Sequence, residues 1–422
     1  MKLWDKGTSV NLVMETFTVG SDNELDCNYF FPFDIRGTKA HARALCRAGV
    51  LTESELVLVL DELETLKSKW KSGEVTVPVS DEDCHTTIES HLTSTLGDTG
   101  RKIHTGRSRN DQALTMIRLW MQATLRTGIM KPLLSVEGYL QRLSARYDKD
   151  LFIGYTHTQQ AMPITLGHYF DSYREQLEDL YKYIDPISYS LNSNPLGSGA
   201  GFGSSVDIDR HFTSRELGFT DVQVNSLYCQ NSRGLFELRY VHALSQVMMT
   251  LQKIATDMIL YTSREFGFFD TDDSICTGSS MMPQKRNLDI AELIRANHAM
   301  VMGYETQLHT LSHGLMSGYN RDYQLMKKCI VDAYEATHGS IKATLTLLAG
   351  ITPNREAIKS KLNVDIFTTD LAISESIKTG KPFRTVYKTI MSDIENIQLT
   401  EEEMLELVKT RVTLGSPGNY RN

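Results

Sequence analysis

The chain has 422 residues, 41% of them hydrophobic and 23% charged, which is typical of a folded protein with two or three domains. It has 44 lysines and arginines against 52 aspartates and glutamates, and this acidic balance argues against a nucleic-acid partner, because nucleic-acid binding needs a broad basic surface. No apolar run is long enough to span a membrane, the first residues lack the apolar core of a signal peptide, and the six cysteines show no metal or disulfide spacing. We therefore expect a cytoplasmic protein with reduced thiols and no membrane association.

The first part of the chain, residues 1–106, is predicted to be a separate N-terminal domain of short helices. Helical patterns over residues 37–48 and 53–69 are joined by polar turns. Strand-like alternation is scarce in the whole chain, and Val75–Val79 is its best example.

Side chains that bind metals gather just after that segment, in Asp81–His85, with Glu89 and His91 beyond it. Their spacing matches no familiar ligand set, so we predict no metal. The glycine-rich stretch 197–203 lacks the G-x-G-x-x-G spacing and follows no predicted strand, which favours a loop between helices over a dinucleotide site. We therefore predict no cofactor.

The middle of the chain, residues 107–352, is predicted to be a bundle of unusually long helices. Apolar residues recur there every three or four positions. Proline is rare, and Pro132 is expected to kink the first of these helices, because proline disrupts a helix interior. The expected helices cover residues 113–147, 235–266, 290–311 and 326–348.

Some of these helices are apolar on more than one face, as at Val247, Met248 and Met249. One chain does not cover such a surface, which favours an oligomer with a shared helical core. Residues 353–422 are predicted to be a small C-terminal domain of short helices, one of them capped by Thr368–Asp370.

Three polar segments carry reactive groups. The first, residues 104–112, crowds two arginines, a serine and an asparagine into a turn that leads into a long helix. A helix start with free backbone N–H groups beside arginines is an anion site. The second, residues 155–163, contains His157. A lone histidine indicates a functional site only when other reactive groups face it.

The third segment, residues 277–287, starts as a Gly-Ser-Ser loop with exposed N–H groups and hydroxyls. Pro283 is then expected to precede a helix that carries Lys285, Asn287 and Glu292 close together. A lysine and an amide beside a loop of hydroxyls would stabilise a developing oxyanion.

Together these segments resemble the fumarase/aspartase superfamily and, within it, the argininosuccinate lyase family. Residues 278–287 match the superfamily signature G-S-S-x-M-P-x-K-x-N throughout. Residues 104–112 resemble the H-T-G-R-S-R-N-D-Q of argininosuccinate lyases rather than the equivalents in fumarases or adenylosuccinate lyases. Further matching segments are spread over most of the chain, at residues 34–41, 81–85, 156–163 and 319–322.

The resemblance implies an all-α subunit of three domains, whose long central helices join those of three other copies in a homotetramer. It also implies composite active sites, each lined by segments from three chains, and a small-molecule substrate. The implied reaction is the reversible cleavage of argininosuccinate to L-arginine and fumarate, a β-elimination across a C–N bond in arginine biosynthesis.

Motif positions then imply roles for single residues. Ser279 matches the family's catalytic serine, a base, with Ser280 as the alternative, while Lys285 and Asn287 match groups that hold the reacting carboxylate. His157 matches the catalytic histidine and Glu292 the carboxylate that pairs with it; whether His157 protonates the leaving nitrogen or orients the substrate stays open. The matching substrate-binding positions are Ser108, Arg109, Asn110, Thr156, Tyr319, Gln324 and Lys327, and His85 matches a histidine near the site.

The chain departs from the family pattern at places away from the proton-transfer residues. We expect these departures to act on recognition of the arginine half of the substrate, so a lyase for an N-acylated argininosuccinate is one alternative. Another fumarate-releasing lyase of the superfamily and a catalytically silent structural protein are two more. The departures are Trp4–Gly7, without the usual Gly-Gly-Arg-Phe, Ser232–Gly234 for Asp-Arg-Asp, Arg321 for lysine, and Leu325–Met326 for acidic residues.

Overall fold

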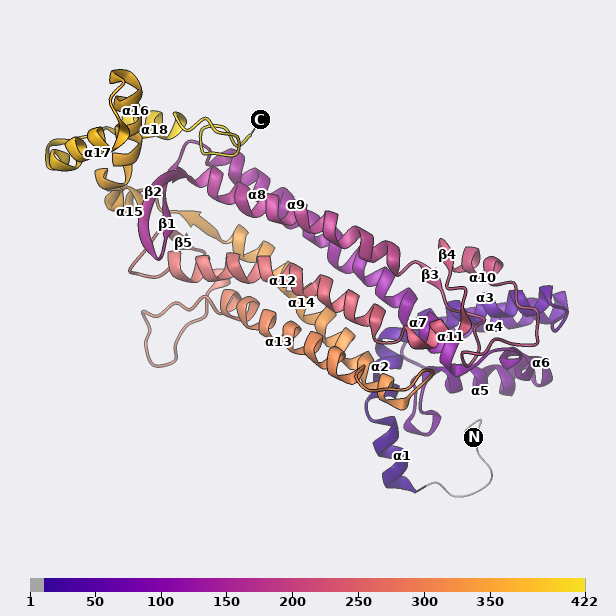
Figure 1. Cartoon of the computed structure of the whole chain (residues 1–422). Helices are drawn as coiled ribbons and strands as arrows, with labels where there is room; N and C mark the ends of the chain where they lie inside the picture. Colours follow the sequence, from indigo (N-terminus) through magenta and orange to yellow (C-terminus); the bar gives the residue numbers. More distant parts are fainter. Residues whose placement is uncertain (1–10, 422) are drawn as a thin grey trace. The chain divides into compact units, whose positions relative to one another are not determined.

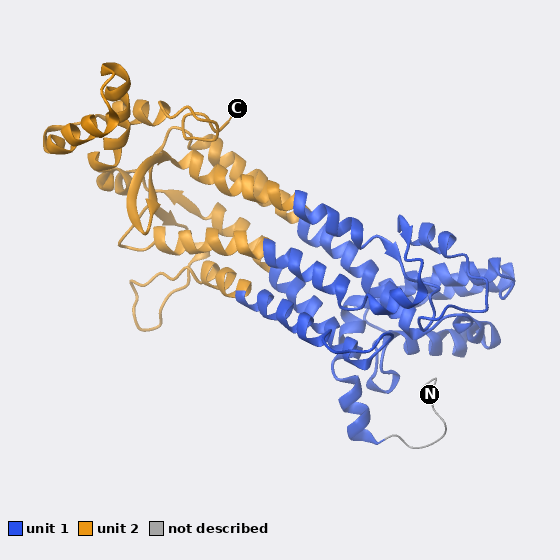
Figure 2. Ribbon diagram, viewed as in Figure 1, with its two compact units in different colours: residues 1–130, 182–246, 299–338 blue, residues 131–181, 247–298, 339–422 orange. Residues whose placement is uncertain are grey.

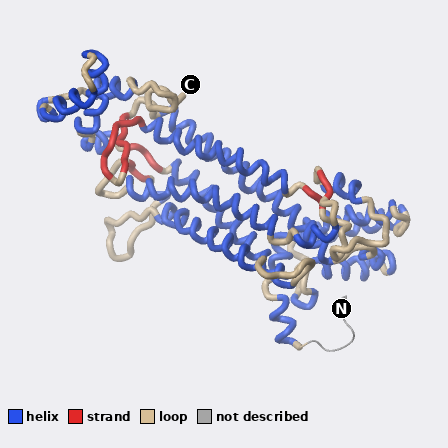
Figure 3. Tube along the Cα trace, viewed as in Figure 1, coloured by secondary structure: helices blue, strands red, loops and turns tan. Residues whose placement is uncertain are grey.

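The computed structural model describes residues 11–421 (Figure 1), so the departure at Trp4–Gly7 lies outside the described residues. Helices dominate, and the strands form only two-stranded pairs in this part of the chain (Figure 3). Contacts divide the chain into two compact units (Figure 2). Unit 1 runs up to Met130 and adds Lys182–Gln246 and Ala299–His338, and unit 2 contains Lys131–Tyr181, Val247–His298 and Gly339 onward. The domain boundaries expected at residues 106 and 352 stay a prediction.

Unit 1 begins with short helices whose starts are set by local side chains. Thr52 and Glu55 form a reciprocal capping box at the start of one helix. Pro32 lies in the first turn of another, where its missing N–H costs nothing. These elements are α1 (Leu12–Val19), α2 (Asp22–Leu25), the π-helix η1 (Asp26–Phe30), α3 (Phe31–Arg47), α4 (Glu53–Lys71), the 3-10 helix η2 (Val79–Asp81), α5 (Cys84–Leu96), α6 (Asp98–Arg101) and the 3-10 helix η3 (Lys102–His104).

The strand predicted at Val75–Val79 is wrong. Residues 74–78 belong to no helix or strand, and η2 starts at Val79. Val77 is buried, and its carbonyl accepts a hydrogen bond from the Asn23 side chain at 3.0 Å. A single side chain therefore uses the hydrogen-bonding group that a neighbouring strand would have used.

The rest of unit 1 includes the glycine-rich stretch 197–203, which forms turns, as the sequence predicts. Gly197 and Gly199 have positive φ angles, and their N–H groups donate to the buried Asp111 carboxylate at 2.9 and 3.0 Å. This loop is therefore tied to the start of a long helix. The remaining short elements are the parallel pair β3 (Ser193–Asn194) and β4 (Asp221–Val222), α10 (Arg210–Leu217), α11 (Ser226–Asn231) and the 3-10 helix η6 (Arg321–Leu325).

The long helices predicted for the middle of the chain are confirmed with one change. The first is interrupted: α7 (Arg109–Ala123) is followed by the π-helix η4 (Thr124–Met130) and then α8 (Lys131–Arg146). The break therefore comes before Pro132, which takes the second position of α8, where proline is tolerated. The helices predicted over 235–266, 290–311 and 326–348 are α12 (Leu235–Tyr261), which ends before Phe266, α13 (Asp289–Leu311) and α14 (Met326–Ala349). A further long helix, α9 (Leu166–Ser190), has no counterpart among the predicted helices.

Unit 2 is built around an antiparallel hairpin, β1 (Leu151–Thr156) and β2 (Gln159–Thr165), on a cluster of aromatic rings. Phe152 meets Tyr261 and Phe268 edge to face, each at 5.5 Å between ring centroids. A second antiparallel pair joins β5 (Phe269–Thr271) to β6 (Ile351–Pro353), and the 3-10 helix η5 (Asp273–Ile275) follows β5.

The C-terminal part of unit 2 consists of short helices, as predicted, but the expected cap is wrong. Thr368 is itself the first residue of its helix, and its hydroxyl donates backwards to the Asp365 carbonyl at 2.7 Å. Asp370 is instead bound by the guanidinium of Arg411. These elements are α15 (Arg355–Lys361), the 3-10 helix η7 (Val364–Phe367), α16 (Thr368–Thr379), α17 (Phe383–Ser392), the 3-10 helix η8 (Ile394–Asn396) and α18 (Glu401–Lys409). Across residues 11–421, none of the helices combines the length and the apolar character that crossing a membrane requires.

Candidate active site

Unit 1 contains a cavity of about 140 Å³. Its lining comes from α2, the start of α5 and the residues before it, α7, the segment between α11 and α12, and the segment that leads into and begins α14. The structure brings together here six side chains that the sequence singled out: His85, Arg109, Asn110, Tyr319, Gln324 and Lys327. It adds six polar side chains that are not among the predicted substrate-binding residues: Asp22, Glu82, Asp83, Arg233, Arg321 and Tyr323.

Helix α7 begins at Arg109, beside this cavity, and its first N–H groups are partly capped by side chains. Ser108 accepts a hydrogen bond from the Asn110 N–H at 3.2 Å, and Asp111 accepts one from the Ser108 N–H at 2.9 Å. The expected set of free N–H donors is therefore partly used within the helix. Ser108 is a cap outside the cavity lining, and Arg109 supplies the positive charge from within it.

Arg109 is held by side chains that also line the cavity. Its guanidinium lies 3.4 Å from the Glu82 carboxylate and 3.3 Å from that of Asp83, and it donates to Thr86 at 2.7 Å. Arg109 is about a quarter exposed, with 25% of its side-chain surface open. An anionic ligand in the cavity therefore meets a cation whose direction is already fixed.

The buried ammonium of Lys327 lies between two carboxylates, 2.7 Å from Asp26 and 3.0 Å from Asp22. Although burial acts to lower the pKa of Lys327, these two carboxylates raise it above its usual value. Burial raises the pKa of Asp22 to about 6, against the opposing effect of Lys327. Asp22 and Lys327 are 305 positions apart, so no local pattern in the sequence links them.

His85 is oriented by a buried carboxylate behind it. Its Nδ1 lies 2.8 Å from Asp34, which also accepts from the Gln112 amide at 2.8 Å. Burial acts to lower the pKa of His85, but Asp34 outweighs it, so the pKa of His85 is raised. Burial acts to raise the pKa of Asp34, but His85 and its other partners outweigh it, so the pKa of Asp34 is lowered. The buried Nε2 of His85 has no hydrogen-bond partner within residues 11–421, and His85 lines the cavity. This imidazole therefore has a donor left for a ligand.

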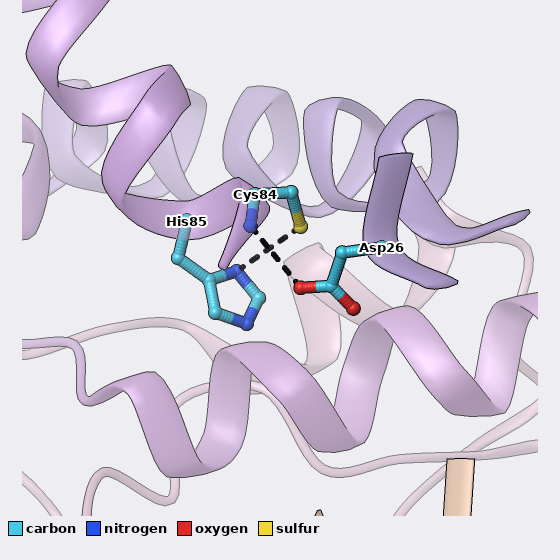
Figure 4. A group of neighbouring side chains, drawn as sticks. All are labelled: Asp26, Cys84 and His85. Carbon is cyan, nitrogen blue, oxygen red and sulfur yellow. Dashed lines mark hydrogen bonds between the residues drawn. The ribbon is translucent and has the colours of Figure 1, made fainter. Parts of the chain in front are cut away.

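The same region contains a group with metal-ligating atoms, Asp26, Cys84 and His85 (Figure 4). Each of these side chains already has a partner: Asp26 binds Lys327, His85 Nδ1 binds Asp34, and Cys84 Sγ donates to Asp34 at 3.6 Å. Burial and the charges of Asp26 and Asp34 hold the pKa of the Cys84 thiol well above its usual range, which keeps the thiol protonated. We assign no metal to this group.

Arg233 contributes a second buried guanidinium to the cavity. It lies over the Tyr319 ring at 4.9 Å and donates to the Asn110 carbonyl at 2.7 Å. Gln324 donates to the Thr18 carbonyl at 2.8 Å, which ties the segment before α14 to α1. The sequence pointed to Arg233 only as part of a departure from the family pattern.

In unit 2, Thr156 and His157 lie at the exposed tip of the β1–β2 hairpin. Thr156 pairs with Gln159, so His157 and Thr158 are the two residues of the turn. Both have positive φ angles, 54° and 60°, which is uncommon for residues other than glycine. The imidazole of His157 is therefore presented on a tight turn.

Ser279 lies in an exposed loop closed at its base by Thr277 and Asn287, which exchange two backbone hydrogen bonds of 2.9 Å. The Ser279 hydroxyl oxygen accepts from the N–H groups of Met281 and Met282 at 3.3 and 3.1 Å. Two donors on one oxygen stabilise a negative charge on it. The loop therefore supplies part of what a serine needs to act as a base.

Lys285 and Asn287 are not on the helix, contrary to prediction. The helix α13 begins at Asp289, because Asn287 uses its backbone groups to pair with Thr277. Lys285 is exposed in the loop, and of the three predicted side chains only Glu292 is helical. Within the described residues, no hydrogen bond or ion pair joins His157 to Ser279, Lys285 or Glu292.

Comparison with known proteins identifies the family. A family model described as Lyase matches residues 15–303. Argininosuccinate lyases from Bacteroides thetaiotaomicron and Thermotoga neapolitana are each 36% identical, the first over 100% of this chain and 93% of its own length, the second over 92% and 97%. That from Xanthomonas campestris pv. campestris is 38% identical over 92% of this chain and 89% of its own. The chain belongs to the argininosuccinate lyase family.

Solved structures of the wider superfamily share the fold. EDDS lyase in complex with formate superimposes with a TM-score of 0.79 at 21% identity, covering 97% of this chain and 88% of that one. A class II fumarase from Schistosoma mansoni gives 0.75 at 16% identity, covering 93% of each chain. The all-α fumarase/aspartase fold expected for a family member is therefore confirmed.

Proposed function

We propose that this protein is an argininosuccinate lyase, which reversibly cleaves argininosuccinate to L-arginine and fumarate in arginine biosynthesis. The observation that carries this proposal is the 36% identity to a curated argininosuccinate lyase over 421 residues, 100% of the chain. The substrate is a small molecule with three carboxylates, and a cavity lined by Arg109, Arg233, Arg321 and Lys327 suits a carboxylate of such a ligand.

The difficult step is the removal of a weakly acidic proton from the carbon next to a carboxylate. We assign this step to Ser279, whose oxygen is already bound by the Met281 and Met282 N–H groups. The electron pair of the C–H bond moves into the carboxylate, which becomes a dianion held by Lys285 and Asn287. When the C–N bond breaks, that pair forms the fumarate double bond and the guanidino nitrogen takes up a proton.

We assign the handling of that second proton to His157, with Glu292 as its partner. An imidazole paired with a carboxylate carries protons at neutral pH and keeps one orientation. His157 and Glu292 lie on separate elements, the hairpin turn and α13. Their meeting belongs to the assembled protein in this proposal, with one active site lined by segments from three chains.

The assembly that we propose is a homotetramer. Helices α12 and α13 keep large apolar side chains exposed: Met249 at 49%, Leu293 at 63% and Met300 at 52%. Rows of exposed apolar side chains on long helices are typical of surfaces that become buried in an oligomer. We place the tetramer in the cytoplasm, without a cofactor, a nucleic acid or a membrane as partner.

The unit 1 cavity is the proposed receptor for the arginine half of the substrate. Tyr319, Gln324, Lys327, Arg109 and Asn110 line it. Thr156 and Ser108 are predicted binding residues outside this lining. The carboxylate of the arginine half suits Arg109 and the unpartnered Nε2 of His85. Its α-ammonium group suits the carboxylate of Asp22.

The test is an assay with the purified protein and argininosuccinate, in which the ultraviolet absorbance of fumarate is followed and arginine is quantified by chromatography. Adenylosuccinate, aspartate and an N-acetylated argininosuccinate are run beside it. Turnover of plain argininosuccinate well above the other three supports the proposal, and preference for any other substrate replaces it.

The role of Ser279 is tested by Ser279→Ala. This variant is expected to lose turnover by several orders of magnitude while it keeps the wild-type mass in solution, because the base is removed from an exposed loop. Ser280→Ala is the matched control and is expected to keep most of the activity. The reverse pattern would make Ser280 the base.

A further inference from the structure

The turn between β1 and β2 has a backbone conformation that its two residues do not favour. A two-residue hairpin turn with positive φ at both positions is usually made by Asn-Gly. Here His157 and Thr158 occupy it, with φ of 54° and 60°. Threonine is branched at Cβ, and such residues rarely adopt this region. The turn is therefore strained, and strain of this kind concentrates at functional sites.

The strands beneath the turn do not let it relax. Phe152 packs edge to face on Tyr261 and Phe268. At Gly154 the backbone approaches the Met162 carbonyl so closely that a Cβ there would lie 2.8 Å from the oxygen. A slip of the strands by one residue would turn Phe152 to the other face of the hairpin, away from Tyr261 and Phe268. These contacts fix the register up to a bulge between Gly154 and Tyr155. Beyond the bulge, Tyr155 pairs with Gln160 and Thr156 with Gln159, which leaves two residues for the turn.

Thr158 adds a bond within the turn itself. Its hydroxyl donates to the carbonyl of His157 at 2.6 Å, and its side chain is otherwise exposed. The bond links the side chain of one turn residue to the backbone of the other. It restrains the peptide unit that sets the direction of the His157 side chain.

We propose that Thr158 is a positioning residue for His157, an inference that rests on the proposed function and deepens it. The strained turn and its hydroxyl–carbonyl bond fix the direction of the imidazole before substrate binds. A catalytic group held in its working orientation loses less freedom in the transition state, and small misplacements cost much of the rate. Thr158 itself touches neither the substrate nor the transferred proton.

The test uses three substitutions at this exposed position in the full-length protein. Thr158→Val keeps the branched Cβ and removes the hydroxyl, Thr158→Gly removes both the hydroxyl and the strain, and Thr158→Ser keeps the hydroxyl. We expect kcat for argininosuccinate to fall by about ten- to a hundredfold in the valine and glycine variants, with KM nearly unchanged, and serine to restore most of it. Thr389→Val is the matched control, an exposed threonine on α17 whose hydroxyl also donates to a backbone carbonyl.

Hydrogen–deuterium exchange of residues 151–165 gives a readout that does not depend on activity. Exchange at the turn is expected to be faster in Thr158→Gly than in the wild type, with an unchanged or raised midpoint of thermal unfolding. Unchanged exchange would overturn the claim that the turn is rigid. Faster exchange with wild-type kcat would overturn the claim that rigidity positions His157.

Two measurements distinguish failure of the proposed function from failure of this inference: the activity of the wild type and that of His157→Asn. A wild type that does not cleave argininosuccinate refutes the proposed function, and the exchange data then decide the rigidity of the turn alone. His157→Asn keeps a residue that tolerates positive φ. If His157→Asn is as active as the wild type, His157 is not catalytic, and the positioning role falls with it.

Discussion

Replacing Lys327 by methionine removes the ammonium that contacts two buried carboxylates, while a side chain of similar length fills its place. Lys327 is 7% exposed and Asp26 0%. Breaking a buried ion pair from one side costs about 3–5 kcal/mol, because the remaining charge stays buried without compensation. We therefore expect Lys327→Met to lower the free energy of unfolding by about that amount near neutral pH.

The pKa of Asp22 gives an independent scale for this effect. Burial raises it from 3.8 to about 6 even with the lysine in place, which corresponds to roughly 3 kcal/mol at about 1.4 kcal/mol per pH unit. The folded protein therefore binds this proton more tightly than the unfolded chain, and the folded state gains stability as the pH falls from about 6 towards about 4. Without Lys327 this gain increases, so the loss in Lys327→Met should be smaller at about pH 5 than at about pH 8.

The assay is urea denaturation followed by circular dichroism at a fixed subunit concentration, since association contributes to apparent stability. Lys328→Met is the matched control: Lys328 pairs with Asp332 at 2.8 Å but is 61% exposed, so its loss should stay below about 1 kcal/mol. In the double variant Lys327→Met/Asp22→Asn, part of the stability should return. A loss below about 1 kcal/mol for Lys327→Met, or a loss that does not shrink on acidification, would refute the reasoning.

Three further substitutions test other contacts by the same denaturation assay. Asp34→Asn should lower the free energy of unfolding by about 3 kcal/mol near pH 6 and by less at about pH 9, because the raised pKa of His85 makes the His85–Asp34 pair most stabilising at low pH. An equal loss of stability at both pH values would refute a charged pair. Gly234→Ala should cost about 1–3 kcal/mol, since Gly234 has a φ of 81° and a new Cβ would lie 2.2 Å from the Ser312 hydroxyl; wild-type stability would contradict the close contact. Asp111→Asn should lower the free energy of unfolding by about 1–3 kcal/mol and raise KM for argininosuccinate, because the carboxylate that accepts from the glycine loop and from the cap of α7 is weakened as an acceptor. An unchanged KM would show that the glycine loop does not affect substrate binding.

The long helices could be predicted from the sequence because their apolar spacing is set locally. The hairpin β1–β2 could not, because its strands are stabilised by an aromatic cluster drawn from distant parts of the chain. Val75–Val79 fails for the opposite reason: it alternates like a strand, but Asn23 takes the place of a neighbouring strand. Local patterns thus predicted the helices and missed pairing that depends on partners far along the chain.

The candidate site divides in the same way. Motif matches pointed to Arg109, Tyr319 and Lys327, and the structure gathers their side chains around one cavity. Asp22 has no such motif, and its effect on the cavity depends on burial and on Lys327, which only the folded chain brings beside it. The meeting of the Ser279 loop with His157 stays a prediction, and in the proposed function it belongs to the assembled protein.

The loop around Ser279 carries its own hydrogen-bond donors for the serine oxygen. The two backbone N–H groups that donate to the Ser279 oxygen belong to Met281 and Met282, two and three residues further along the chain. Because these amides belong to the same loop as the hydroxyl, this support for an alkoxide needs no contact with another element or another chain.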